Sequence, residues 1–488
     1  MDSGGAVKKQ NSAAARHLCD MTAVQVMDLL KRREVSSVEL VEAAITRIEA
    51  IDPIVNALPI RRFELARKEA ATFDQSKNPS AIPGWLGGLP IAIKDYNDVE
   101  GSITTYGSPI FANNRPPRSD RTVSRLQRLG AIAIAKSNVP EFAGSHTFNP
   151  VFGTTGNPWN VGRTAGGSSG GSAAALASGM VWLATGNDLG GSLRIPAAYC
   201  GIVGMRPSVG RVPRPDSVVP YDPLWVEGPM GRCVADVALM LDAEAHQDAG
   251  DPLSLPQPDR PFSEAVRNPR PPKRVGYTSN LGIGEVDSEV AAICQQAVQK
   301  FKNFGAKVDN DHPDFTGGFE SFQTLRATLF AAVRGPLLER HRDQICPEII
   351  WNIEKGLQQD GTAMARAERL RGELFLRVMD FFGHHDILAC PTVAVSPFPV
   401  DQRYPKHING QELTSYIDWM YLTFVLTLTG CPVISVPVGL TREGMPVGLQ
   451  IMGRPRGDSD VLAAAQLMEQ AGQFAAMVPR LVKTSSIN

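Results

Sequence analysis

Residues 164–172 read TAGGSSGGS, and residues 186–196 read GNDLGGSLRIP. Each stretch contains a Gly-Gly-Ser turn, in which Ser168 and Ser192 are the serines. Glycine adopts backbone conformations that are closed to other residues and lets a substrate approach the backbone amides. A serine nucleophile that uses backbone N–H groups as an oxyanion hole needs both properties. The two turns therefore predict a serine-based catalytic centre.

Other readings of the glycine-rich turns are a flexible loop, a phosphate cradle and a nucleophile elbow. The chain has no G-x-x-x-x-G-K-[ST] motif, and the glycine run lacks G-x-G-x-x-G spacing. Residues 166–170 do satisfy G-x-S-x-G, the elbow of a Ser-Asp-His hydrolase. An elbow should follow a strand, but residues 157–165 are polar and contain Pro and Gly, which predicts a loop. That reading also needs a late histidine, and the candidates are His312, His341, His384, His385 and His407.

Alternation of short apolar runs with helical patterns predicts an α/β protein with a covered, parallel or mixed sheet. The runs that predict buried strands are residues 89–93, 131–135, 181–184, 274–277, 387–389, 433–436 and 447–452. The helical patterns are residues 121–129, 172–178 and 288–304. Ser36 and Glu39 form a capping box that begins a further amphipathic helix.

Composition excludes several classes of function. The 488 residues are 43% hydrophobic and 20% charged, and 49 Lys plus Arg balance 50 Asp plus Glu, so no net field favours a nucleic acid or an anionic membrane. The seven cysteines are scattered without a C-x-x-C pair, which is typical of reduced thiols. The first residues lack a signal-peptide apolar region, and Thr, Gly and Pro interrupt the apolar stretch 421–440. We therefore expect a soluble, cytoplasmic protein.

At this point the chain resembles the amidase signature family. The resemblance spans nearly the whole chain, from SSVELVEAAITRIEAIDPIVNA through GGLPIAIKD, AIAKSNVPEF and the two Gly-Ser turns to ISVPVG and MPVGLQIMG. It implies a single amidase signature domain over residues 1–488, with a central mixed, twisted β-sheet covered by α-helices on both faces. The signature core would span about residues 85–215, a Pro-rich exposed connection about 248–272, and a helical cap about 318–382.

The resemblance also assigns a catalytic triad to this chain. It implies that Ser192 is the nucleophile, Ser168 the relay and Lys94 the base, and that the peptide bond before Ser168 is cis. A serine hydroxyl needs a base to become a good nucleophile, and a lysine serves only if desolvation keeps it neutral. The apolar strand that ends at Lys94 is suited to that purpose.

Further residues near the two turns receive roles from the same resemblance. The oxyanion hole would consist of the backbone amides of Leu189, Gly190, Gly191 and Ser192. Ala143 matches a position that lines the acyl site in relatives, although a core alanine accounts for it equally well. Asp188 and Arg194 flank the nucleophile, and a charge pair that braces the turn explains them better than direct chemistry.

Lys136 is the alternative to Lys94 as the base. It ends AIAIAK as Lys94 ends LPIAIK, so the residues alone leave both open, and the resemblance selects Lys94. The adjacent His384 and His385 are typical of surface or capping positions, because no second ligand cluster completes a metal site. We expect neither metal nor cofactor.

Two positions depart from the family pattern near the triad. Asn187 stands where the family often has threonine, and Tyr96 where a smaller polar residue is common. Both are expected to reshape the pocket and neither changes the triad. Trp225, Phe330 and Trp351 are candidates for the leaving-group side, with core packing as the alternative for each.

The expected reaction is cleavage of C–N bonds through an acyl-enzyme. Substrates would be small to medium, partly apolar amides, with anilides, carbamates (urethanes) and esters as related cases. The alternatives are the A-type subunit of a glutamyl/aspartyl-tRNA amidotransferase and a noncatalytic binding protein. Against the former, residues 213–232 read PRPDSVVPYDPLWVEGPMGR and not a serine-rich stretch. A small-molecule substrate is the expected partner, and the family also allows a homodimer.

Overall fold

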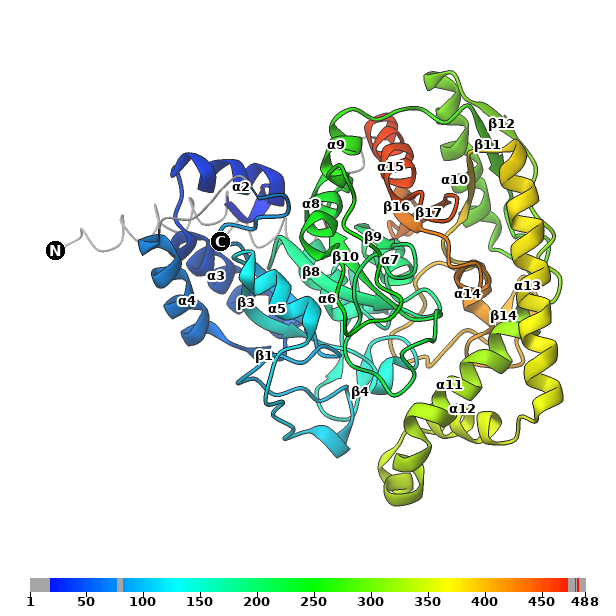
Figure 1. Ribbon diagram of the computed structural model, residues 1–488, viewed down its shortest axis with the longest axis horizontal. Coiled ribbons are helices and arrows are strands. Elements are labelled where there is room, and N and C mark those ends of the chain that lie inside the picture. The colour runs from blue at the N-terminus through cyan, green and yellow to red at the C-terminus, as the bar shows by residue number, and fades with distance from the viewer. Residues whose placement is uncertain (1–17, 77–81, 473–478, 480, 482–488) are drawn as a thin grey trace.

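One large sheet organises the protein. The computed structural model describes residues 18–76, 82–472, 479 and 481, so the N-terminal segment expected to lack a signal peptide lies outside the described residues. The sheet has 11 strands in the order β1-β3-β2-β8-β10-β9-β16-β17-β13-β11-β12 (Figure 1). In chain order the strands are β1 (Ile60–Arg61), β2 (Pro90–Lys94), β3 (Ile132–Ser137), β8 (Leu183–Asp188), β9 (Val203–Arg206), β10 (Val226–Gly231), β11 (Arg274–Tyr277), β12 (Lys307–Asp309), β13 (Ile387–Pro391), β16 (Val433–Leu440) and β17 (Pro446–Met452).

The sheet is mixed. Strand β2 pairs in parallel with β3 and β8, and β11 pairs in parallel with β12 and β13. The strands between these two parallel groups, from β10 to β17, pair antiparallel with their neighbours. The predicted α/β class and the mixed sheet are therefore confirmed.

Both faces of the sheet are covered. Every residue of β2, β3, β8, β9, β10, β13 and β17 is buried. Because successive side chains of a strand point to opposite faces, complete burial requires a layer on each side. Helices α6, α7, α8, α10 and α15 make many of these contacts with the strands.

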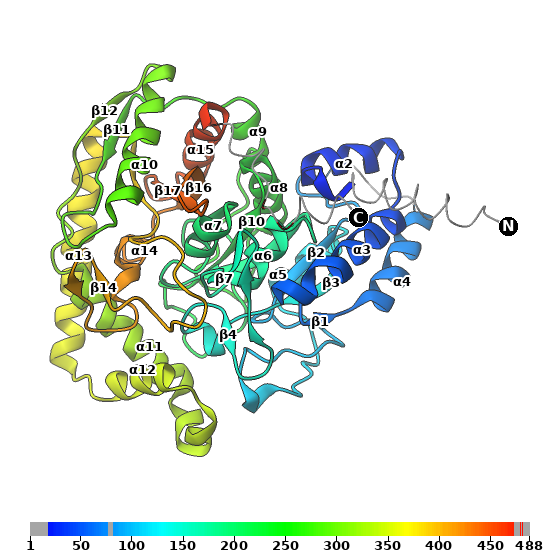
Figure 2. The same cartoon turned by 180° about the vertical axis from the view of Figure 1, so that it is seen from behind.

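The helices lie around the sheet from one end to the other. They are α2 (Ala23–Arg32), α3 (Ser37–Val55), α4 (Phe63–Gln75), α5 (Arg121–Arg128), α6 (Gly170–Ala177), α7 (Arg194–Cys200), α8 (Val234–Glu244), α9 (Phe262–Arg267), α10 (Ser288–Val298), α11 (Gly318–His341), α12 (Pro347–Leu357), α13 (Gly361–His384), α14 (Tyr421–Thr427) and α15 (Asp458–Gly472). Figure 1 and Figure 2 show α2 to α4 at one end of the molecule and the long α13 at the other.

Most predicted elements match the structure within a few residues. The Ser36 capping box is present ahead of α3, with both of its hydrogen bonds. The predicted helix 288–304 is wrong in its second part, because α10 ends at Val298 and residues 299–304 form a 3₁₀ helix. Strands β9 and β10 were not predicted, since Gly204 interrupts β9, and Gly228 and Pro229 interrupt β10. The loop predicted over residues 157–165 is wrong in part, because β7 (Asn160–Thr164) pairs with β6 (Gly156–Asn157).

The connection over residues 248–272 is less exposed than predicted. It contains α9, in which Phe262 and Val266 are buried against the core. Asp251 is also buried, where it pairs with Arg214 at 3.2 Å. Apolar residues four apart on a short helix share one face, and that spacing outweighs the polar composition of the segment.

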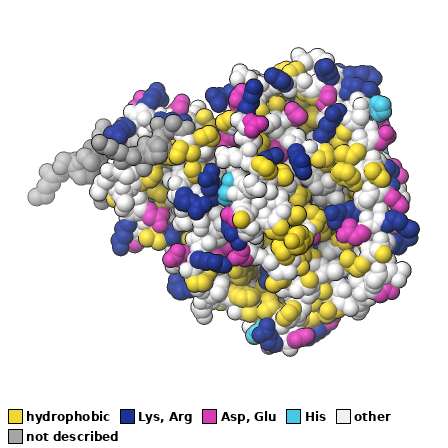
Figure 3. All heavy atoms as spheres, in the orientation of Figure 1, with side chains coloured by type: hydrophobic (Ala, Val, Ile, Leu, Met, Phe, Trp, Pro, Cys, Tyr) yellow, Lys and Arg dark blue, Asp and Glu magenta, His cyan; other side chains and the backbone are white. Residues whose placement is uncertain are grey.

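The surface and the cysteines agree with an ordinary globular composition. Figure 3 shows Lys, Arg, Asp and Glu side chains interspersed over one face, so that face has no broad region of a single sign. No helix in the described part of the chain combines the length and apolarity needed to cross a membrane. The stretch 421–440 is instead divided between α14 and β16. All seven cysteines are free.

Two helical glycines give a matched prediction about packing. At Gly171 in α6 a Cβ atom would lie 2.4 Å from the Asn138 amide nitrogen, whereas at the exposed Gly372 in α13 it would meet nothing within 4 Å. We expect Gly171→Ala to destabilise the protein by about 1–3 kcal/mol, because α6 must move. Gly372→Ala should stabilise it by about 1 kcal/mol, because alanine is the better helix former. Urea denaturation of both variants measures the two free energies, and a Gly171→Ala variant that loses no stability would contradict the packing around α6.

Candidate active site

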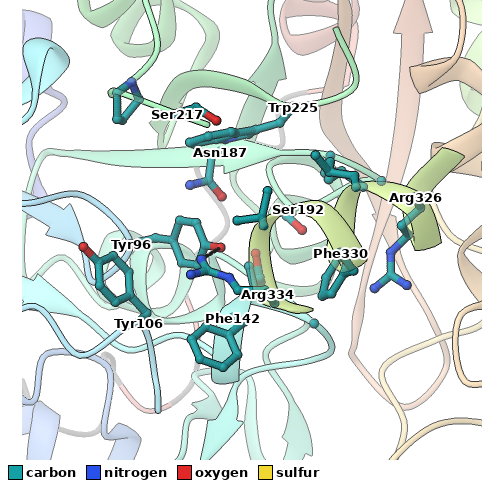
Figure 4. Close-up of a pocket in the computed structure, with 18 of the residues that line it drawn as sticks. Tyr96, Tyr106, Phe142, Asn187, Ser192, Ser217, Trp225, Arg326, Phe330 and Arg334 are labelled. Atoms are coloured by element: carbon teal, nitrogen blue, oxygen red, sulfur yellow. Dashed lines mark hydrogen bonds between the residues drawn. The ribbon is translucent and has the colours of Figure 1, made fainter. Parts of the chain in front are cut away.

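A cavity of about 460 Å³ lies where the two Gly-Ser turns meet α11. Its wall includes Ser168 and Ser192 from the turns, Ala143, and Phe330 from α11. Figure 4 shows Ser192 in the centre of this pocket, with Trp225 on one side and Phe142 on the other. Sequence segments far apart in the chain therefore converge on one pocket.

Lys94 ends β2 and contacts two residues that line this cavity. Its side chain is fully buried, and its Nζ donates to Ser168 Oγ at 2.7 Å and to Asn187 Oδ1 at 2.6 Å. Its backbone N–H donates to Thr185 Oγ1 on the neighbouring strand β8 at 2.8 Å. The parallel strands β2 and β8 therefore hold the lysine against the first Gly-Ser turn.

Burial makes Lys94 a weaker proton acceptor than an ordinary lysine. Desolvation lowers the pKa of Lys94 to about 7, although the negative charges of Glu227 and Asp188 act in the opposite direction. Its two side-chain partners are both neutral, so no adjacent carboxylate holds the ammonium form. A substantial fraction of the amine is therefore uncharged near neutral pH.

Ser168 is held at the start of α6 by a crowded backbone. The peptide bond between Gly167 and Ser168 is cis, as the family resemblance implied. A Cβ at residue 167 would lie 2.4 Å from the carbonyl oxygen of Ser145, so only glycine fits there. Ser168 is buried and lines the cavity.

Ser192 stands on the turn that joins β8 to α7. Gly191 before it has φ of 128°, and a Cβ there would lie 2.3 Å from Thr423 Oγ1, so the turn requires glycine. Ser192 is half-buried and lines the cavity, and its hydroxyl makes no hydrogen bond to the described residues. The hydroxyl is therefore available to a substrate.

The backbone N–H groups around Ser192 differ in their availability. The amides of Leu189, Gly190 and Ser192 donate to no group in the described part of the chain. Gly191 is different, because its N–H donates to Asp188 Oδ1 at 2.9 Å. The oxyanion hole of four amides therefore stays a prediction, and within that set the Gly191 N–H already has a partner in the turn.

Asp188 fixes the turn through two arginines. Arg194 contacts both of its carboxylate oxygens at 3.0 Å, and Arg206 lies 3.3 Å from one of them, with all three side chains fully buried. Burial alone would raise the pKa of Asp188, but the two arginines outweigh it and lower the pKa to about 2. The predicted bracing pair is present, and Arg206 is a third member that the sequence did not indicate.

Lys136 has a different environment from Lys94. In the parallel pair β2–β3, Lys94 is in register with Ser137, so Lys136 points to the opposite face of the sheet. Its Nζ lies 2.7 Å from Asp95 Oδ1 and 2.9 Å from the carbonyl oxygen of Ile103. The structure therefore brings Lys94 to Ser168 and gives Lys136 a buried ion pair.

Other predicted pocket residues divide into two groups. Ala143, with φ of 59°, Trp225 and Phe330 line the cavity. Trp351 does not, because it is 37% exposed and packs its edge against Tyr416. None of the lining residues in the described chain is a histidine, so the alternative with a catalytic histidine has no support at this cavity.

Several polar residues at the site were not predicted as functional. Asn187 accepts a hydrogen bond from Lys94, and its cross-strand partner Glu227 is fully buried with a raised pKa because of desolvation. Arg326 and Arg334 line the cavity from α11. The sequence indicated Asn187 only as a departure from the family pattern. A single sequence offered no signal for Glu227, Arg326 or Arg334.

Comparisons with known proteins agree with this arrangement. The model of the Amidase family matches residues 39–462. An acylamidase of Rhodococcus erythropolis is 34% identical over 464 residues, covering 94% of this chain and 97% of that protein. The A-type subunit of the glutamyl-tRNA(Gln) amidotransferase of Geotalea daltonii is 32% identical and covers 93% of this chain and 97% of that protein.

Solved structures share the fold over almost the whole chain. A bacterial aryl acylamidase of the amidase signature family has a TM-score of 0.86 and 29% identity, covering 93% of this chain and 97% of that chain. A 6-aminohexanoate cyclic dimer hydrolase complexed with substrate also has a TM-score of 0.86, with 27% identity and 95% and 99% coverage. With its family match, its relatives and its fold in agreement, this chain belongs to the amidase signature family and is an amide-hydrolysing enzyme.

Proposed function

We propose that this enzyme cleaves C–N bonds of small to medium, partly apolar amides through an acyl-enzyme on Ser192. The observation that carries the proposal is the 2.7 Å contact between the buried Lys94 Nζ and Ser168 Oγ, beside the cavity that Ser192 lines. A lysine with a lowered pKa and a neutral hydroxyl partner is suited to act as a base. Lys94, Ser168 and Ser192 are the proposed base, relay and nucleophile.

The proposed reaction begins with proton transfer. Neutral Lys94 accepts the Ser168 proton as Ser168 accepts the Ser192 proton, and Ser192 Oγ attacks the amide carbon. The free N–H groups of Leu189, Gly190 and Ser192 stabilise the negative charge that develops on the carbonyl oxygen. The C–N bond then breaks, and the proton returns from Lys94 through Ser168 to the departing amine. Water activated by the same route releases the acid.

The lining of the cavity supports the proposed range of substrates. Aromatic side chains contribute much of its wall, among them Phe142, Trp225, Phe322 and Phe330. Such a lining suits an alkyl or aryl group on the amide. Anilides are therefore proposed substrates, and carbamates (urethanes) and esters are included because they pass through the same acyl chemistry.

The finer organisation of the protein is also a proposal. Helices α11, α12 and α13 occupy the predicted cap, about residues 318–382, and would act as a cap over the cavity. Helix α11 supplies a wall of the cavity. A homodimer, which the family resemblance allows, and a cytoplasmic location, which the scattered cysteines favour, belong to the same proposal. Gel filtration and cell fractionation test them.

The A-type component of a tRNA amidotransferase is the second candidate, favoured by relatives that carry that name at 31–35% identity. Such a component hydrolyses glutamine in a complex, whereas the proposed amidase turns over anilides alone. Assaying the isolated chain with both substrates separates the two.

Ser192→Ala tests the nucleophile and the noncatalytic alternative together. We expect a serine-directed fluorophosphonate to label the wild-type protein at Ser192, and the variant to lose labelling and p-nitroanilide turnover, because no acyl-enzyme forms. Mass spectrometry of the labelled peptide identifies the site. Turnover that survives in Ser192→Ala would exclude this mechanism, and a wild-type protein that neither labels nor turns over any amide would favour a binding protein.

Lys94→Met and Lys136→Met should have opposite effects. Lys94→Met removes the base, so kcat is expected to fall by about 10²–10⁴-fold while the fold remains stable. Lys136→Met leaves the Asp95 carboxylate buried and unpaired, so the free energy of unfolding should fall by about 3–5 kcal/mol. Kinetics and urea denaturation of both variants measure the two effects. Loss of catalysis by a stable Lys136→Met would show that the base has been assigned incorrectly.

The pKa of Lys94 predicts the pH dependence of the rate. Only neutral Lys94 is a base, so kcat/KM should rise about tenfold per unit below pH 7 and level off above about pH 8. Glu227 raises the pKa of Lys94, so Glu227→Gln should shift this acid limb to lower pH. Rates measured from pH 5 to 10 with an uncharged anilide test both expectations. A profile that falls with rising pH across this limb would contradict a lysine base.

A further inference from the structure

Helix α11 presents two arginines to the cavity. Arg326, Phe330 and Arg334 are four residues apart in turn, so they share one face of the helix, and all three line the pocket. Figure 4 shows Arg334 extending from α11 towards Tyr96, while the guanidinium of Arg326 lies beyond Phe330 from Ser192. Of the two arginines, Arg334 is therefore the one on the side of the pocket where Tyr96 lies.

The partners of Arg334 are all neutral. Its Nη2 donates to the hydroxyl of Tyr96 at 2.8 Å. Its guanidinium carbon lies 4.5 Å from the ring centre of Phe142 and 5.9 Å from those of Tyr96 and Tyr106. No carboxylate in the described part of the chain lies within 4.0 Å of the guanidinium. The positive charge of Arg334 therefore contacts aromatic rings and one phenol hydroxyl.

Arg326 adds a second positive charge that is matched in the same way. It is 5% exposed and donates to Asn352 Oδ1 and to the hydroxyl of Tyr416. Its guanidinium carbon lies 4.5 Å from the ring centre of Phe330. Two cations on one helix face thus have only neutral partners, an arrangement that favours an anion in the cavity beside them.

The acidic residues of the cavity wall are already engaged elsewhere. Asp98 accepts the Tyr106 hydroxyl at 2.8 Å, and Asp120 accepts the Asp98 backbone N–H at 2.8 Å. Asp216 pairs with Arg118 at 2.6 Å. None of the three forms an ion pair with Arg326 or Arg334, so neither arginine has a carboxylate partner in the described cavity wall.

We propose that Arg334 binds a carboxylate of the substrate, so that this enzyme prefers amides that carry a carboxylate on a largely apolar chain. A guanidinium offers a planar pair of N–H donors that matches a carboxylate, and a charged acceptor makes a stronger hydrogen bond than the Tyr96 phenol. The carboxylate belongs either to the acyl part, as in a dicarboxylic acid monoamide, or to the amine part, as in an N-acylated amino acid. This inference rests on the proposed amidase function.

Two matched substrate pairs distinguish the positions of the carboxylate. Glutaric acid mono-p-nitroanilide against pentanoic p-nitroanilide tests the acyl side. 4-(Butyrylamino)benzoate against butyric p-toluidide tests the amine side. We expect wild-type kcat/KM to favour the carboxylate in one pair by about tenfold or more. The pair that shows this preference identifies the side.

Variants of α11 then assign the preference to Arg334. Arg334→Met should lower kcat/KM for the preferred carboxylate about 10- to 100-fold more than for its neutral partner, and Arg334→Lys should retain part of the preference. Arg340→Met removes the same charge from an exposed position on the same helix and is the matched control. Melting temperatures verify that each variant is folded.

Two results would overturn the inference. One is a wild-type enzyme whose kcat/KM is equal for each neutral amide and its carboxylate-bearing partner. That result would leave the amidase function intact. The other is a preference that Arg334→Met and Arg340→Met reduce equally. If no amide is turned over, the proposed function fails, and calorimetric titration of both carboxylate amides into Ser192→Ala still tests the anion site. Equal Kd values in Ser192→Ala and Ser192→Ala/Arg334→Met would then reject it.

Discussion

The turn that carries Ser192 depends on the carboxylate of Asp188. This carboxylate is fully buried, contacts two arginines, and also accepts the N–H groups of Gly191 and Leu193. Removing one partner from such a group leaves a buried charge unpaired, which costs about 3–5 kcal/mol. The electrostatics of the interior therefore fix the backbone on which Ser192 stands, and they do so before any substrate binds.

The same network connects distant parts of the chain to the turn. Arg194 also donates to the carbonyl oxygen of Thr423 and to Gln450 Oε1 on β17. Thr423 in turn donates its hydroxyl to the carbonyl oxygen of Gly190. Residues more than 200 positions away thus set the geometry of the turn that carries Ser192. Side chains locked by several hydrogen bonds are what a preorganised oxyanion site requires.

Two buried lysines show how the surroundings determine chemistry. Lys94 and Lys136 end adjacent parallel strands of similar sequence, and both have a pKa lowered by burial. Lys94 contacts a serine hydroxyl and an amide oxygen, whereas Lys136 contacts the Asp95 carboxylate, which favours its charged form. One is therefore suited to accept a proton and the other to hold the sheet together.

The sequence predicted the parts of the fold that depend on local pattern. Apolar runs located β2, β3 and β8, and the glycine-rich turns located Ser168 and Ser192. It could not reveal contacts that arise only when distant segments meet, such as Arg206 with Asp188 or Arg334 with Tyr96. Nor could it show that the Gly191 amide is already occupied, because all four residues of that turn offer the same backbone group. Family resemblance supplied the proposed triad, and only the fold supplied its surroundings.

The order of strands has a consequence for synthesis on the ribosome. Strands β16 and β17, at residues 433–452, lie in the middle of the sheet between β9, at residues 203–206, and β13. The edge of β9 therefore stays unpaired until more than 200 further residues have been translated. Unpaired strand edges promote aggregation, and sheets joined by such distant pairings form slowly. Nascent chains of this enzyme should consequently depend on chaperones until the last strands have emerged.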